Sequence, residues 1–214
     1  MQKSESFPLS ALLSCSGGLQ DAYTYNVRGK VFANAQTGNI VLMSQNFMCG
    51  EWVQSLYYLS PLLSFALGVF VAERIENRFK EKRPLHWRQI ILFIEMAALA
   101  LVGLLPARFD MAANMLVSFS CAMQVQSFRK VQGYGYASTM CIGNLRSGTE
   151  SLSQYFRSRD KMAMRKALTF FSIILIFAVG AGAGGILSGV FGIRTIWISV
   201  VILFIVTVIM MKEE

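Results

Sequence analysis

The chain has 214 residues, of which 54% are hydrophobic and 15% are charged, and its mean hydropathy is positive. This composition is too apolar for an ordinary water-soluble domain and predicts an integral membrane protein. The formal net charge of +8 does not indicate a nucleic-acid partner, because the basic residues gather in loops between apolar segments, as they do in membrane proteins.

The first predicted helix, residues 8–27, is unusually polar for a membrane span. It carries several serines and glycines together with Gln20 and Asp21. Such a helix is stable in a bilayer only if its polar face contacts protein or a water-filled cavity. The segment that follows, residues 31–47, is short and has Gly38 near its middle. We therefore expect it to be a broken or re-entrant helix.

Five further spans are predicted along the chain, at residues 54–71, 89–105, 111–128, 167–193 and 195–212. Residues 53–72, 167–193 and 195–211 contain no charged residue, and runs of about 18 or more such residues indicate transmembrane helices. The span 54–71 contains Pro61, which predicts a kink. The span 167–193 contains two small-xxx-small pairs, Gly180 with Gly184 and Gly185 with Gly189, which predict close helix packing.

A polar motif occurs twice in the chain. Residues 32–39 read Phe-Ala-Asn-Ala-Gln-Thr-Gly-Asn, and residues 136–144 read Tyr-Ala-Ser-Thr-Met-Cys-Ile-Gly-Asn. Upstream of the two copies, Asp21 corresponds to Gln126. The sequence therefore predicts one polytopic membrane domain, residues 1–214, built from repeat halves at about 8–106 and 110–212.

The distribution of basic residues predicts the topology. Three spans per half, with both motif segments re-entrant, place both termini in the cytoplasm. All Lys and Arg residues then lie on the cytoplasmic side except Arg28, Lys30, Arg108 and Arg194. An odd number of spans per half makes the repeat inverted. The predicted fold is thus an all-α integral membrane protein with about six transmembrane helices and two short re-entrant helices.

The two motifs predict a substrate-binding site near the middle of the membrane. Glycine permits a break in the helix, and the exposed N–H groups of a half-helix attract anions and polar ligands. A plain helix cap is the alternative interpretation. The predicted substrate-binding residues are Asp21, Gln36, Thr37, Gly38, Asn39, Gln126, Gly143, Asn144 and Arg146.

Two acids within predicted spans, Asp21 and Glu95, are candidates for proton coupling, because a carboxylate in the bilayer usually has a partner or a function. Asp21 has a structural alternative, hydrogen bonding beside Arg28 or Lys30. Arg146 has one as well, an ion pair with Glu150 four residues later.

The sequence predicts neither a metal site nor a cofactor. The four cysteines form no CxxC pair and have no zinc-ligand spacing. The chain also contains no HExxH, Walker A, GxSxG or dinucleotide-binding motif. We therefore expect a protein that is not an enzyme.

Several of these segments resemble the YoaK family of bacterial membrane proteins, domain of unknown function 1275. The resemblance is carried by residues 18–22, residues 31–39, residues 123–129 and residues 136–146, and it covers essentially the whole chain. Ser127 departs from the family pattern, which has an Asn-Ala pair at this place. The resemblance implies a multi-spanning protein of the bacterial inner membrane and no established substrate.

The leading functional hypothesis is a transporter or permease for a small solute or ion. Its binding site would lie between the repeats, and its transport would be coupled to protons. A channel for a small polar or anionic solute is a close variant. A non-transport scaffold or accessory protein, and an intramembrane enzyme acting on a lipid, are the alternatives of other classes. The expected partners are the lipid bilayer, the solute and, since the chain is small for a transporter, a second copy in a homodimer.

Overall fold

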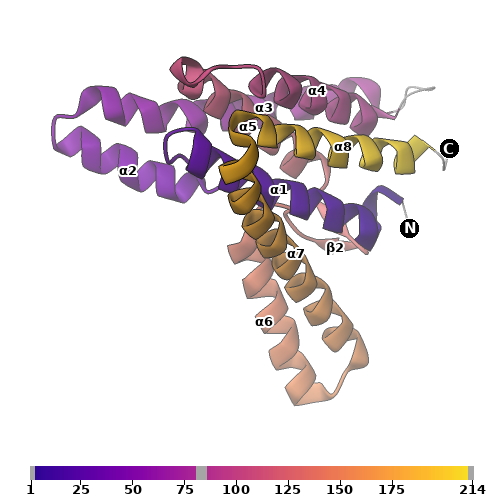
Figure 1. Ribbon diagram of the computed structural model, residues 1–214. Coiled ribbons are helices and arrows are strands. Elements are labelled where there is room, and N and C mark those ends of the chain that lie inside the picture. Colours follow the sequence, from indigo (N-terminus) through magenta and orange to yellow (C-terminus); the bar gives the residue numbers. More distant parts are fainter. Residues whose placement is uncertain (1–2, 81–85, 212–214) are drawn as a thin grey trace.

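The computed structural model describes residues 3–80 and 86–211, which are mostly helical (Figure 1). The predicted cytoplasmic residues Lys82, Arg83 and Lys212 lie outside these ranges. The α-helices are α1 (Phe7–Val27), α2 (Gln36–Met48), α3 (Trp52–Phe79), α4 (Trp87–Val102), α5 (Asp110–Ser127), α6 (Cys141–Ser158), α7 (Lys161–Phe191) and α8 (Ile196–Met211). Short 3₁₀ helices lie at Lys3–Glu5, Ala107–Phe109 and Gly192–Thr195, and strands β1 (Lys130–Val131) and β2 (Tyr134–Gly135) form a small hairpin.

Two stretches of the described residues are long and apolar enough to cross a membrane. They are Trp52–Phe79 and Lys161–Met211, of which the second comprises α7, the corner at Gly192–Thr195 and α8. Helices α1 and α5 are continuous but contain many buried polar residues, which lower their hydropathy, and α4 is only 16 residues long. These three helices therefore do not qualify by length and composition. The helix positions nevertheless follow the predicted segments closely.

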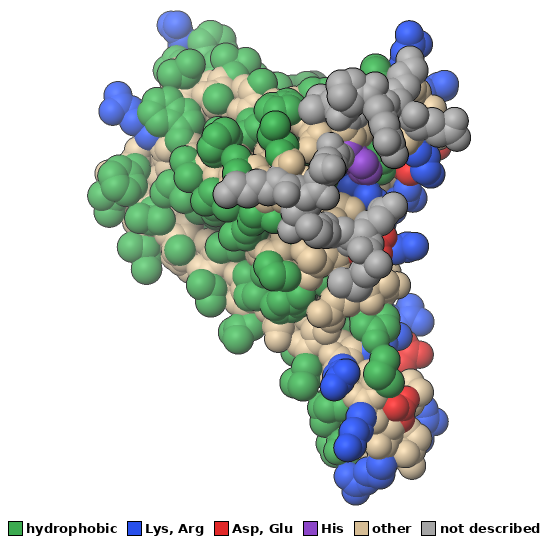
Figure 2. Space-filling view, turned by 90° about the vertical axis from the view of Figure 1, so that its right-hand side faces the viewer, with side chains coloured by type: hydrophobic (Ala, Val, Ile, Leu, Met, Phe, Trp, Pro, Cys, Tyr) green, Lys and Arg blue, Asp and Glu red, His purple; other side chains and the backbone are tan. Residues whose placement is uncertain are grey.

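The long helices expose apolar stripes. On α7 the exposed apolar residues recur at intervals of seven and four, which is the spacing of one helix face. The stripe consists of Leu168, Leu175, Val179, Ile186 and Val190. Figure 2 shows hydrophobic side chains over much of one side of the molecule, whereas Lys and Arg side chains gather mainly along the other edge and at the lower tip. A surface of this kind suits contact with lipid.

The helices are paired across the chain. Helix α1 packs most extensively against α7, and α5 packs most extensively against α3. Helix α2 packs mainly on α3 and α6 mainly on α7, so that two helical hairpins extend in different directions while both termini lie at one end (Figure 1). Helices α4 and α8 contact each other and close the bundle.

Small residues permit the two principal crossings. A Cβ atom on Gly18 of α1 would overlap the Phe177 carbonyl of α7, and one on Gly180 would overlap the Cys15 carbonyl of α1. Gly68 of α3 has the same role against the backbone of α5. The packing prediction is therefore confirmed for Gly180 and Gly184. Within the described chain the second pair forms no such crossing, because a Cβ on Gly189 would meet nothing within 4 Å.

A fully buried arginine joins four helices just after α1. The Arg28 guanidinium donates hydrogen bonds to the Tyr23 hydroxyl, to Asp110 Oδ1 and to the Val102 carbonyl, each at 2.8 Å. Its own carbonyl accepts hydrogen bonds from Tyr57 of α3 and Asn114 of α5, at 2.9 and 2.7 Å. The contact with Asp110 is an ion pair. The charge distribution assigned Arg28 to a segment outside the membrane on the non-cytoplasmic side and did not indicate its burial, whereas its side chain is 0% exposed.

Replacing Arg28 with methionine is expected to reduce the free energy of unfolding by about 3–5 kcal/mol, because it leaves Asp110 without its cation. The measurement is thermal or denaturant unfolding of the purified protein in detergent. Arg108→Met is the matched control, since Arg108 is exposed and stacks on the adjacent Phe109. Equal stability of the two variants would contradict the assigned role.

Gly180→Val is expected to destabilise the α1–α7 crossing by about 1–3 kcal/mol or more, since its side chain would collide with backbone atoms of α1. Gly182→Val makes the same change where a Cβ meets nothing within 4 Å. Both variants are compared by their unfolding midpoints in one detergent. Tolerance of the Gly180 variant equal to that of the Gly182 variant would show that the crossing is looser than described.

Candidate functional site

Asp21 lies on the face of α1 that points into the bundle. Gly17, Asp21 and Thr24 are buried on this face, at the spacing of successive helical turns. The Asp21 side chain is only 8% exposed, and its Oδ1 accepts a hydrogen bond of 2.8 Å from the backbone N–H of Asn34. The loop that carries the first motif therefore folds back over the middle of α1.

Asn34 fixes this loop to α1 a second time. Its Nδ2 donates to the Gly17 carbonyl at 3.4 Å, whereas its Oδ1 is buried and has no hydrogen-bond partner among the described residues. A buried amide oxygen without a partner is rare in proteins, since the missing hydrogen bond is costly. This oxygen is therefore a candidate acceptor for a ligand.

The second motif reaches the same place from the opposite half of the chain. Thr139 lies so close to Gly17 that a Cβ on that glycine would overlap its methyl group. Ser138 accepts a hydrogen bond of 2.8 Å from Gln124 of α5, and the buried Thr139 hydroxyl has no partner in the described part of the chain. The two motif loops therefore meet on α1 at Gly17.

Helix α4 carries a second buried carboxyl group. Glu95 is 1% exposed, and its Oε1 has no hydrogen-bond partner among the residues that the structure describes. The Cys121 thiol of α5 interacts electrostatically with both Asp21 and Glu95, and it donates to Gln20 Oε1 at 2.9 Å. Within residues 3–80 and 86–211, neither carboxyl group forms an ion pair. The structural alternative for Asp21, a hydrogen-bonding role beside Arg28 or Lys30, is found in part. Asp21 accepts a hydrogen bond from the loop at Asn34, whereas Arg28 pairs with Asp110 and Lys30 lies over the Tyr25 ring.

Gln36 and Asn39 brace the first loop. Gln36 Nε2 donates to the Ala33 carbonyl at 2.7 Å and to the Ser118 hydroxyl of α5 at 2.8 Å. Asn39 Nδ2 donates to the Phe32 carbonyl at 2.8 Å and to Gln36 Oε1 at 3.0 Å. These two side chains position the loop. Of the other predicted residues here, Thr37 is exposed and Gly38 is half-buried.

Asn144 braces the second loop in the same way. Its Nδ2 donates to the carbonyl of Ala137, seven residues earlier, at 2.7 Å, and its Oδ1 accepts from the Ala137 N–H at 3.3 Å. Asn39 and Phe32 have the same separation of seven. Gly143 and Arg146 are exposed on α6, and Arg146 does not form the ion pair with Glu150 that their spacing suggested.

Gln126 is half-buried, and no hydrogen bond of its side chain joins it to the site. Gln124, two residues earlier, contacts the second loop in its place. Sequence comparison of the halves thus selected the wrong glutamine. Gln20, Asn34 and Cys121 were also missed. Asn34 lies within the first motif and Gln20 is a polar neighbour of Asp21, which were usable signals, whereas no pattern pointed to Cys121.

The arrangement suits binding of a proton, a small cation or a small polar solute. Two acids supply titratable groups, while buried amide and hydroxyl groups can donate or accept hydrogen bonds. In the part of the chain that the structure describes, no group of three or more His, Cys, Asp or Glu residues could hold a metal ion. Neither of the two cavities described lies at this site.

Comparison with known proteins places the chain in a family. The model of the DUF1275 family, described as a protein of unknown function, matches residues 9–209. The chain is similar to the UPF0700 transmembrane protein YoaK of Bacillus subtilis (strain 168), with 26% identity over 207 residues that cover 92% of this chain and 90% of the relative. No solved structure matches the chain. The chain belongs to the DUF1275 family and is a transmembrane protein.

Proposed function

We propose that the protein is a proton-coupled transporter, or permease, for a small solute. The observation that carries the proposal is the presence of two buried carboxyl groups, Asp21 where the motif loops meet on α1 and Glu95 on α4. A buried acid without a cationic partner in a membrane protein is best explained by binding and release of a proton or cation during function.

The proposed site lies between two repeat halves, residues 8–106 and 110–212. The packing of α1 on α7 and of α5 on α3 supports this division, since the first helix of each half packs on the third helix of the other. Two matching hydrogen bonds support it further, from the Asn39 amide to the Phe32 carbonyl and from the Asn144 amide to the Ala137 carbonyl. Sites between repeats near the membrane centre are typical of secondary transporters.

We also propose an inverted topology with about six spans and both termini in the cytoplasm of a bacterial inner membrane. Helices α2 and α6 are then re-entrant elements, one entering from each side. The 13-residue length of α2 supports this, because about 20 residues are needed to cross a bilayer. A homodimer would use the outward face of α7, where Gly182 and Gly189 remain open.

Asp21 is the proposed proton acceptor, and Glu95 is a second proton site. In this mechanism the solute binds the free acceptors and donors around Gly17, among them Asn34 Oδ1 and the Thr139 hydroxyl. Because Asp21 and Glu95 are 8% and 1% exposed, solute entry in this mechanism requires the two hairpins to separate. Protonation changes the cost of burying the carboxyl group and thereby biases the equilibrium between conformations.

Asp21→Asn is expected to abolish proton-coupled flux, with at least a roughly tenfold loss, because it removes the titrating group and keeps an oxygen for the Asn34 N–H. The protein is reconstituted in liposomes under a proton gradient. Charge movement and uptake are recorded for small organic anions, amino acids, sugars and halides. Glu150→Gln, the same change at an exposed position of α6, is the matched control.

Unchanged saturable flux in the Asp21 variant would remove Asp21 from the mechanism. Flux that rises linearly with solute concentration would indicate a channel. Absence of flux across the whole panel, together with co-purification of a partner protein, would favour a scaffold or accessory role.

The inverted repeat predicts that the tips of the two hairpins lie on opposite sides of the membrane. Cys49, between α2 and α3, is exposed, and Ser158→Cys introduces a thiol between α6 and α7. In a background without Cys15, Cys121 and Cys141, an impermeant maleimide should label Cys49 in intact cells. It should label the thiol at position 158 only after permeabilisation. Labelling of both from the same side would exclude the inverted arrangement.

A further inference from the structure

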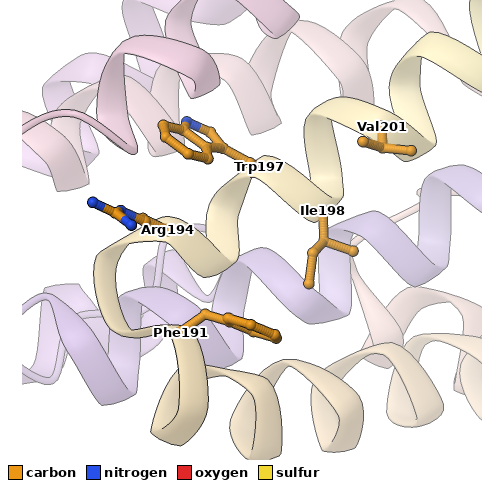
Figure 3. A pocket seen from close by; sticks show the side chains of 5 residues that line it. All are labelled: Phe191, Arg194, Trp197, Ile198 and Val201. Carbon is orange, nitrogen blue, oxygen red and sulfur yellow. The ribbon is translucent and has the colours of Figure 1, made fainter.

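The corner between α7 and α8 forms a groove with a single charge at one end. Its cavity of about 310 Å³ is lined by Phe191, Arg194, Trp197, Ile198 and Val201. Figure 3 shows Arg194 at one end and Val201 at the other, with Phe191 of α7 and Ile198 of α8 between them. The groove thus changes from cationic to apolar along the direction of α8.

The walls of this groove are held in place by hydrogen bonds. The Tyr23 hydroxyl donates to the Ile193 carbonyl at 3.1 Å, which ties the corner to α1. Trp197 Nε1 donates to the Ala100 carbonyl of α4 at 3.1 Å, and a Cβ on Gly103 would overlap its indole ring. The Trp197 indole therefore packs closely against the C-terminal end of α4 at Gly103. Because these contacts fix the indole and the corner, the groove exists without a ligand.

Arg194 lies at the boundary of an apolar structure. Residues 167–193 and 195–211 on either side of it contain no charged residue. Its side chain is exposed and forms no hydrogen bond or ion pair with any other residue that the structure describes. An arginine between two apolar helices is expected to extend to the membrane–water interface, where tryptophan is also enriched.

We propose that this groove binds an anionic phospholipid, with its phosphate at Arg194 and an acyl chain along Phe191, Ile198 and Val201. The charge complementarity of one unpaired guanidinium and the apolar lining support this occupant. A zwitterionic phospholipid fits the apolar part equally well, so selectivity comes from Arg194 alone. The inference does not depend on the proposed transport function, because the groove and the Asp21 site involve separate residues.

The test is native mass spectrometry of the purified protein with phosphatidylglycerol and phosphatidylcholine of identical acyl chains. Wild-type protein should prefer phosphatidylglycerol by roughly fivefold, the preference expected for one basic residue near an anionic headgroup. Arg194→Gln should remove the preference, whereas Arg108→Gln should retain it, since Arg108 is an exposed arginine outside the groove.

A second variant tests the apolar part. Val201→Trp fills the groove from an exposed position and should reduce binding of both lipids, without a shift in the unfolding midpoint. A fluorescence experiment tests where the lipid binds. In a Trp52→Phe, Trp87→Phe background Trp197 is the remaining tryptophan, and brominated phosphatidylglycerol should quench its fluorescence. Val201→Trp is not used here, because it would add a second tryptophan.

Three outcomes would overturn the proposal. They are equal binding of the two lipids by wild-type protein, a preference that survives Arg194→Gln, and a dimer that Val201→Trp dissociates while lipid binding stays unchanged. The last outcome would assign the groove to a second copy of the chain.

Discussion

Burial of the Arg28 guanidinium constrains the whole arrangement. A charged group inside a membrane protein is stable only when its donors are paired, and here a carboxylate, a phenol and a carbonyl satisfy them. The acceptors come from α1, α5 and α4, so those helices must meet at this point. The Arg28 carbonyl then joins α3 through Tyr57. With the chain fixed here, the loop that follows α1 can only turn back along it, which places Asn34 over Asp21.

The connection that follows α5 is built differently. After α5 the chain forms the β1–β2 hairpin, and the Tyr136 N–H donates to the Arg129 carbonyl at 3.0 Å. The residue that faces the returning loop is the neutral Gln124, where α1 has Asp21. The helix residue that contacts the loop is thus an acid on α1 and an amide on α5. Any proton-dependent step at these helices would arise from the half that carries the acid.

The sequence predicted the helices well because long apolar runs and their charged ends are local properties. The motif loops were also found, since a polar repeat in an apolar chain is conspicuous. Burial of Arg28 could not be predicted, because its partners Asp110 and Val102 are far away in the sequence. The choice of Gln126 over Gln124 failed for another reason: aligning two halves by sequence does not fix which face of a helix meets the loop. The spacing of Arg146 and Glu150 on one helix predicted an ion pair, but the two exposed side chains do not form it.

The two hairpins are the elements best placed to move in the proposed transporter. Helix α2 packs mainly on α3 and α6 mainly on α7, so each hairpin is attached to the bundle chiefly by its longer helix. Those attachments are the crossings at Gly68, Gly180 and Gly184, where backbones are in close contact with few interlocking side chains. Each motif loop connects a bundle helix to one of these hairpins. Displacement of a hairpin would therefore pull a loop from Gly17 and expose Asp21, while the Arg28 cluster holds the remaining helices together.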